Sequence, residues 1–185
     1  MGRLREELER VRSGAPAPLG FGAAARGGRL SPLLVVAACT SPAQGGEAAK
    51  ARVDAAFLVL HTLNRKWLEG FTSSLANLAW GVELVQPSEE DLGVLKGLGC
   101  DFVVFGGGVP LGVLQEKGMG RLLRGPMDLP EEQARTLGDL PVDALLLDSP
   151  YNPPFLLHQM MDLAAFRARV DRPLLLYLSA PPSIW

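Results

Sequence analysis

Three stretches of the chain share one pattern of hydrophobic and polar positions. The stretches 53–60, 100–105 and 142–147 each carry an aspartate at the second position, followed by an unbroken apolar run. Continuous apolar runs are typical of strands that are buried on both faces of a parallel sheet. The pattern recurs at roughly 40–50 residues, about two strand–helix units, and this spacing indicates an internal repeat.

Further apolar runs lie between these three and predict additional strands. With them the chain has about seven predicted strands; the additional ones are Leu33–Cys39, Trp80–Val85, a weaker Arg121–Arg124 and Pro173–Leu178. We interpret residues 1–185 as one α/β domain, in which residues 1–30 form an N-terminal helix and a lead-in rich in glycine and proline. Residues 31–185 then hold the strand–helix repeats.

Helix signals separate the predicted strands. Gly2–Arg12 reads as a charged amphipathic helix with Leu4, Leu8 and Val11 on one face. Ser88 begins a helix with the features of a capping box, and Asn64 caps a helix over Arg65–Ala76. The other predicted helices are a short one over Gly46–Arg52, one capped by Asp128 that ends near Gly138, and one opened by Asn152 with an apolar stripe at Leu156, Met160, Leu163 and Val170.

Alternating strands and helices predict a parallel α/β fold, and a two-unit repeat favours a barrel over an open doubly wound sheet, which is the alternative. The succession of apolar strands resembles the strand series of TIM-barrel enzymes and, more loosely, of barrels related to dihydroorotate dehydrogenase or to phosphate-binding barrels. The resemblance lies in the fold, so it assigns no catalytic residue. Because a complete barrel typically needs ~250 residues, we expect about seven βα units with the last one missing.

The composition of the chain excludes several classes of protein. Hydrophobic residues make up 48% of the chain, which excludes disorder, and the net charge of −2 gives no basic footprint for nucleic acid. The apolar runs are shorter than the ~18 residues of a membrane span, and no signal peptide is present, so a cytoplasmic location is expected. Cys39 and Cys100 lie in apolar runs, where buried inert thiols are expected.

In a barrel the active site forms at the carboxyl ends of the strands. The predicted strand ends give a ring of candidates: Cys39, Thr40, His61, Glu83, Gln86, Asp128, Asp148, Ser149 and Ser179. Of these, we predict His61, Glu83 and Asp148 as catalytic, because a histidine can exchange protons near neutral pH and an inward carboxylate needs a polar partner. Gly106, Gly107 and Gly108 follow an apolar run, and their backbone amides are predicted to bind an anion.

The other motifs in the sequence give little support for a specific chemistry. Gly20-Phe-Gly-Ala-Ala-Ala25 matches a dinucleotide fingerprint, but it follows Ala15-Pro-Ala-Pro18 rather than a strand. No lysine lies in a predicted strand, which disfavours a Schiff-base aldolase. The first strand exits as Cys39-Thr-Ser-Pro42, without the His-x-His pair of hydrolytic metal sites, so no metal is predicted.

Three hypotheses of function follow. The first is a barrel-type enzyme that acts on a small, anionic metabolite, phosphorylated or flavin-type, with FMN as a candidate cofactor; it requires His61 and Glu83 at the same end of the sheet. The second is a non-catalytic or truncated barrel remnant that serves as a binding or assembly module, with a homo-oligomer covering its C-terminal edge. The third is an open-sheet nucleotide binder that uses Gly20 and Gly22.

Overall fold

Seven parallel strands form one sheet, and their order in space equals their order along the chain. The computed structural model describes residues 3–13, 33–75, 77–115 and 118–178. The strands are β1 (Val36–Cys39), β2 (Ala55–Leu60), β3 (Ala79–Leu84), β4 (Phe102–Phe105), β5 (Gly120–Pro126), β6 (Ala144–Asp148) and β7 (Leu174–Tyr177). A sequential order has no reversal point, which a doubly wound sheet requires. The alternative of an open doubly wound sheet was therefore wrong.

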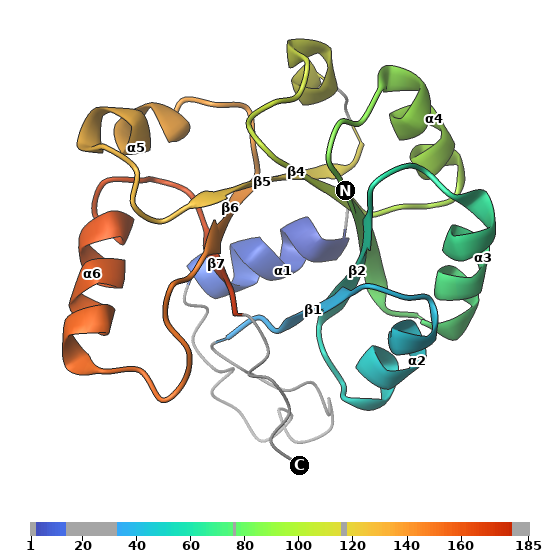
Figure 1. Ribbon diagram of the computed structural model, residues 1–185, viewed down its shortest axis with the longest axis horizontal. Helices are drawn as coiled ribbons and strands as arrows, with labels where there is room; N and C mark the ends of the chain where they lie inside the picture. The colour runs from blue at the N-terminus through green and yellow to red at the C-terminus, as the bar shows by residue number, and fades with distance from the viewer. Residues whose placement is uncertain (1–2, 14–32, 76, 116–117, 179–185) are drawn as a thin grey trace.

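The sheet curls around one helix and carries the others on its outside (Figure 1). Five helices follow strands and cover the convex face, while the N-terminal helix α1 lies within the curl. The helices are α1 (Arg3–Arg12), α2 (Ala43–Lys50), α3 (Arg65–Ser74), α4 (Glu89–Gly97), α5 (Glu131–Leu137) and α6 (Leu157–Arg167), with a 3₁₀ helix, η2 (Leu111–Gln115), after β4. The parallel, barrel-like α/β fold predicted from the repeats is confirmed.

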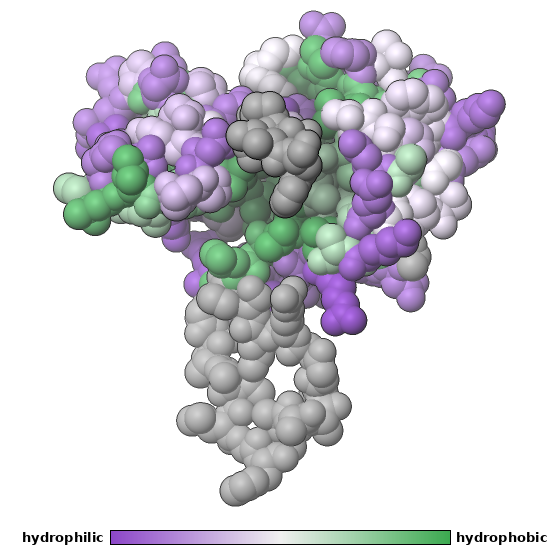
Figure 2. Space-filling model, turned by 60° about the horizontal axis from the view of Figure 1, so that its bottom comes forward, coloured by the Kyte–Doolittle hydropathy of each residue, from purple (hydrophilic) through white to green (hydrophobic). Residues whose placement is uncertain are grey.

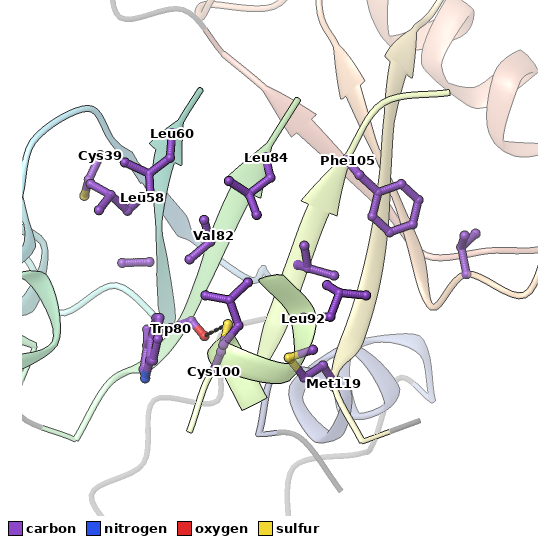
Figure 3. Packing of buried hydrophobic residues seen from close by; sticks show 14 of the residues in the cluster. Cys39, Leu58, Leu60, Trp80, Val82, Leu84, Leu92, Cys100, Phe105 and Met119 are labelled. Atoms are coloured by element: carbon purple, nitrogen blue, oxygen red, sulfur yellow. Dashed lines mark hydrogen bonds between the residues drawn. The ribbon is translucent and has the colours of Figure 1, made fainter. Parts of the chain in front are cut away.

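The alternation of side chains along each strand produces two hydrophobic cores. The outer core joins the convex face to the helices, as with Leu58, Val82 and Phe105 of the strands (Figure 3). The inner core lines the concave face with Phe57, Phe102 and their neighbours. Both faces of the strands are therefore buried, which explains why their apolar runs are continuous rather than alternating.

The repeated aspartates have one structural role at the strand entrances. Asp54, Asp101 and Asp143 each precede an even-numbered strand, and each side chain accepts a hydrogen bond from a backbone N–H at the entrance of the preceding odd-numbered strand, at 2.8, 3.1 and 2.9 Å. In return, the N–H of each aspartate donates to the carbonyl of the same residue on the odd strand. This reciprocal pair recurs three times and accounts for the two-unit period. Strands β2, β4 and β6 each begin directly after the aspartate, two residues after the start of the repeated stretch.

Helix α1 occupies the concave face at the amino ends of the strands. Leu4 and Leu8 are buried in the inner core, as the amphipathic pattern predicts. Arg3 donates to the Asn77 carbonyl through its guanidinium, at 2.7 Å, and to Asp101 through its backbone N–H, at 3.2 Å. Since α1 closes this end of the curl, the carboxyl ends of the strands remain as the end where a site can form.

The curl does not close among the described residues, since the strand pairings end at β1 on one side and β7 on the other. Figure 2 views the side on which the opening lies and shows hydrophobic surface gathering in the seam between two lobes. The side chains beside the two edge strands include Leu33, Val35 and Leu178, which are exposed. The homo-oligomer expected to cover this edge stays a prediction.

Several helix boundaries differ from the expectation. The predicted short helix over Gly46–Arg52 begins earlier, at Ala43, and Asp128 caps nothing, because helix α5 starts after Pro130. Helix α6 begins at Leu157 rather than near Asn152. Of its expected apolar stripe, Leu156 and Met160 are about half exposed, while the helix buries only Phe166. No helix in the described ranges is long and apolar enough to cross a membrane.

Candidate functional site

Four polar or aromatic side chains share the concave face near the carboxyl ends of the strands. Glu83 on β3, Arg124 on β5, Asp148 on β6 and Tyr177 on β7 all alternate in phase with residues of the inner core. Helix α1 fills the opposite end of the curl, so this cluster lies where barrel enzymes hold their active sites. We call these four residues the mouth cluster.

Arg124 joins the members of the mouth cluster. Its Nη1 donates to Oε1 of Glu83 at 2.6 Å, and its Nε and Nη2 donate to Oδ1 of Asp148 at 2.9 and 2.7 Å. The guanidinium carbon lies 4.1 Å from the centre of the Tyr177 ring, a cation–π contact. Desolvation opposes the charge of Arg124, but the hydrogen bonds and charges of Asp148 and Glu83 outweigh it and raise the pKa of Arg124 above its ordinary value.

The two carboxylates of the mouth cluster differ in their environments. The Glu83 side chain is 15% exposed and its Oε2 is buried with no hydrogen-bond partner among the described residues, whereas the Asp148 side chain is 48% exposed. A buried carboxylate oxygen without a partner carries a desolvation cost, so Glu83 depends strongly on Arg124. The sequence predicted that Glu83 would need a polar partner, and Arg124 is that partner.

His61 lies at the same end of the sheet as Glu83. It directly follows β2, whose Leu60 pairs with Leu84 of β3, so positions 61 and 83 are both at the carboxyl ends of neighbouring strands. The side chain is exposed, and no hydrogen bond joins it to any residue in the described ranges. The structure thus brings Glu83 and Asp148 together through Arg124, but it gives His61 no contact with them.

Gly106, Gly107 and Gly108 form the turn after β4, the strand between those that carry Glu83 and Arg124. None of the three requires a positive φ, and a Cβ at each would meet nothing within 4 Å. Neither the backbone conformation nor the space around these positions therefore requires glycine. Within the described ranges, the N–H groups of Gly107 and Gly108 donate no hydrogen bond to another residue.

The remaining candidates of the predicted ring have local roles. Thr40 donates from its N–H and its hydroxyl to Oε1 of Gln44, and the Ser149 hydroxyl pairs with the backbone of Tyr151. Cys39 is buried, Gln86 is exposed, and Asp128 is exposed with no hydrogen bond to another described residue. Ser179 and the glycine motif over 20–25 lie outside the described residues.

Both buried thiols are unreactive by their environment. Desolvation raises the pKa of Cys100 to about 12, and its thiol donates to the carbonyls of Phe102 at 3.1 Å and Trp80 at 3.8 Å (Figure 3). Burial, with a smaller contribution from Glu47, also raises the pKa of Cys39. Since the thiolate is the nucleophile, neither cysteine is suited to covalent catalysis.

Arg124 and Tyr177 were missing from the predicted site. Arg124 belongs to the weakest predicted strand, and an arginine inside an apolar run is a signal of the same kind as Glu83. Tyr177 precedes the end of the last apolar run, where alternation places it in phase with Leu175 on the concave face. Weighing every charged residue within the strands would have found Arg124.

The arrangement offers guanidinium and amide donors beside two carboxylates. A guanidinium has five N–H groups, and the hydrogen bonds of Arg124 to other described residues use three of them, which leaves one N–H on each of Nη1 and Nη2. Over the residues described, no group of three or more His, Cys, Asp or Glu side chains is arranged to hold a metal ion. Comparison with protein-family models gives no match, and comparison with curated proteins gives none either.

Proposed function

We propose that the protein is a barrel-type enzyme acting on a small anionic metabolite, which binds at the mouth cluster. The observation that carries the proposal is Arg124, held on the concave face by Glu83 and Asp148 at the carboxyl ends of the strands. Its two remaining N–H groups form the charged half of an anion site, and the N–H groups of Gly107 and Gly108 form the neutral half. The step from fold to enzyme rests on analogy with barrel enzymes.

The carboxylates supply the acid–base chemistry of the proposal. Glu83 and Asp148 both contact Arg124, so an anion bound to Arg124 lies beside two groups that accept protons. His61, which is exposed at the end of the neighbouring strand, is the third group proposed for the acid–base chemistry. A phosphorylated metabolite or the phosphate of FMN is the kind of anion such a site would take, and the identity of the metabolite and the flavin stay predictions.

Thermal unfolding with a ligand panel tests the proposal. Inorganic phosphate, sugar phosphates, FMN and NAD are added to the purified chain, and a ligand that binds the folded state raises the melting temperature by linkage. Binding at the mouth is then tested with Gly106→Leu, whose side chain would extend over β4 beside Arg124. Gly97→Leu is the matched control, because Gly97 is exposed on α4 and equally uncrowded.

We expect at least one phosphorylated compound to raise the melting temperature, and Gly106→Leu but not Gly97→Leu to abolish the shift. A panel in which no anion shifts the transition would contradict the proposal. So would a shift that both leucine variants retain, because the ligand would then bind away from the mouth.

A further inference from the structure

A hollow lies beside the mouth cluster, between helix α6 and the loops that follow β5 and β6, and Asp148 belongs to its lining. Its volume is about 570 Å³, within the roughly 300–1,000 Å³ of small-molecule pockets. Three of its lining residues, Met127, Leu129 and Phe166, pack with the outer core, whereas the inner core adjoins the mouth cluster. We call this hollow the α6 pocket; it belongs to the helix-covered side of the sheet.

The α6 pocket exists because α6 packs loosely on the sheet. The helix buries only Phe166, while α3 and α4 each bury two residues of the outer core. In the first turns of α6, apolar side chains face solvent: Leu157 is 79% exposed and Met161 is 62% exposed. In Figure 2 hydrophobic side chains project from the left lobe, on the side where α6 lies. The helix therefore leaves space over the ends of β5 and β6 instead of filling it.

The lining of the α6 pocket combines apolar walls with an excess of negative charge. The walls are formed by Pro126, Met127, Leu129, Pro150, Ala165 and Phe166. Asp128 and Asp162 contribute two carboxylates, against the single guanidinium of Arg169. Asp148 also belongs to the lining, but its Oδ1 accepts two hydrogen bonds from Arg124, which compensates its charge. An opening with apolar walls and an acidic rim favours a ligand with an apolar body and a positive charge.

Tyr151 adds an aromatic side chain to the lining of the α6 pocket. Its hydroxyl donates to Oδ2 of Asp162 at 2.7 Å, which ties the loop after β6 to α6 across the pocket. The hydrogen bond to Asp162 raises the pKa of Tyr151, and the Tyr151 side chain is part of the pocket lining. An aromatic face beside carboxylates is a favourable surface for an organic cation.

We propose that the α6 pocket binds an organic cation, a primary amine on an apolar or aromatic body. The amine pairs with Asp128 and Asp162 at the rim, and the apolar body lies against Met127, Leu129 and Phe166. Of the mouth cluster, only Asp148 also belongs to the lining of the α6 pocket.

The probe is 2-phenylethylamine, compared with 2-phenylethanol and 3-phenylpropionate, which have a similar body but no charge or a negative charge. Binding to the full chain is measured by isothermal titration calorimetry. We expect the amine to bind and to exceed both analogues in affinity by about threefold or more, the order of one partly exposed ion pair. No heat of binding for the amine up to about 10 mM, or equal affinity for the alcohol, would overturn the proposal.

Two pairs of variants locate the binding. Ala165→Phe fills the pocket from α6, while Ala164→Phe places the same ring on the next residue of the same helix, which is exposed and outside the lining. Asp162→Asn removes a rim charge, while Asp139→Asn removes an exposed charge elsewhere. We expect Ala165→Phe to weaken amine binding at least tenfold and Asp162→Asn about threefold to fivefold. The controls should change it less than twofold; an equal loss in either control would overturn the proposal.

Discussion

Replacing Arg124 by methionine tests the physical account of the mouth cluster. Methionine keeps an unbranched side chain but removes three hydrogen bonds to the carboxylates of Glu83 and Asp148. Most of the cost falls on Glu83, which is 15% exposed and already has one oxygen without a partner. Losing a hydrogen bond to a charged, mostly buried group costs about 1.5–3 kcal/mol. Asp148 is half exposed and adds at most about 1 kcal/mol. The expected loss in the free energy of unfolding is therefore about 1.5–4 kcal/mol.

The double variant Glu83→Met with Arg124→Met tests whether the loss of stability comes from leaving the Glu83 charge buried without Arg124. Replacing both partners of a buried ion pair by apolar side chains is often neutral, whereas removing one partner leaves a buried charge. We expect the double variant to be at least 1 kcal/mol more stable than Arg124→Met alone, a rough threshold set by the same energetics. Urea unfolding followed by circular dichroism gives the three free energies. A double variant that is less stable than the single one, or a single variant that loses less than about 1 kcal/mol, would refute the account.

Three further changes probe the fold. Gly81→Ala would place a Cβ 2.6 Å from the Phe102 carbonyl oxygen, so we expect a loss of about 1–3 kcal/mol in urea unfolding, with Gly125→Ala, whose Cβ meets nothing, as a near-neutral control. Asp101→Ala removes one hydrogen bond from the N–H of Trp80 at the entrance of β3 and one from the N–H of Arg3 in α1, and it should cost about 1–3 kcal/mol, while an effect below about 0.5 kcal/mol would deny the role of the aspartate. Cys100 has its pKa raised from 9.0 to about 12, so the folded state holds a proton that the unfolded state releases, and stability should fall as pH rises from about 9 towards 12. Cys100→Ala should flatten that fall by about 1.4 kcal/mol per pH unit; an unchanged slope would contradict the assignment.

The repeated aspartates show how far the sequence can predict this fold. Their spacing with continuous apolar runs predicted parallel strands in a two-unit period, and the structure adds the cause, a reciprocal pair of hydrogen bonds at each odd strand. The position of α1 was not predicted. An amphipathic helix with Leu4 and Leu8 on one face needs a hydrophobic partner, but its pattern does not say which surface of the sheet supplies it.

The contacts within the candidate site, in contrast to the fold, could not be predicted from the sequence. The position of Glu83 inside an apolar run and the position of Asp148 at a strand end made both residues candidates for the site. The sequence did not show which residue pairs with either of them. Their pairing depends on Arg124, which reaches from β5 past β4 to β3 and also contacts β6. Such a contact depends on the curvature of the sheet and on side-chain conformation, and a linear pattern of hydrophobic positions contains neither. The α6 pocket was missed for a related reason, because the stripe on α6 predicts close packing that the helix does not achieve.

The central claim, that an anion binds at the mouth cluster, is tested most directly by nuclear magnetic resonance. The ¹⁵N-labelled chain is titrated with a sugar phosphate while the backbone amides of Gly107 and Gly108 and the Nε–H of Arg124 are followed. The account predicts saturable shifts of these three signals with one dissociation constant, while exposed residues at the amino ends of the strands, such as Arg52, stay unchanged. Shifts confined to other parts of the chain, or none at all with the folded protein, would contradict it.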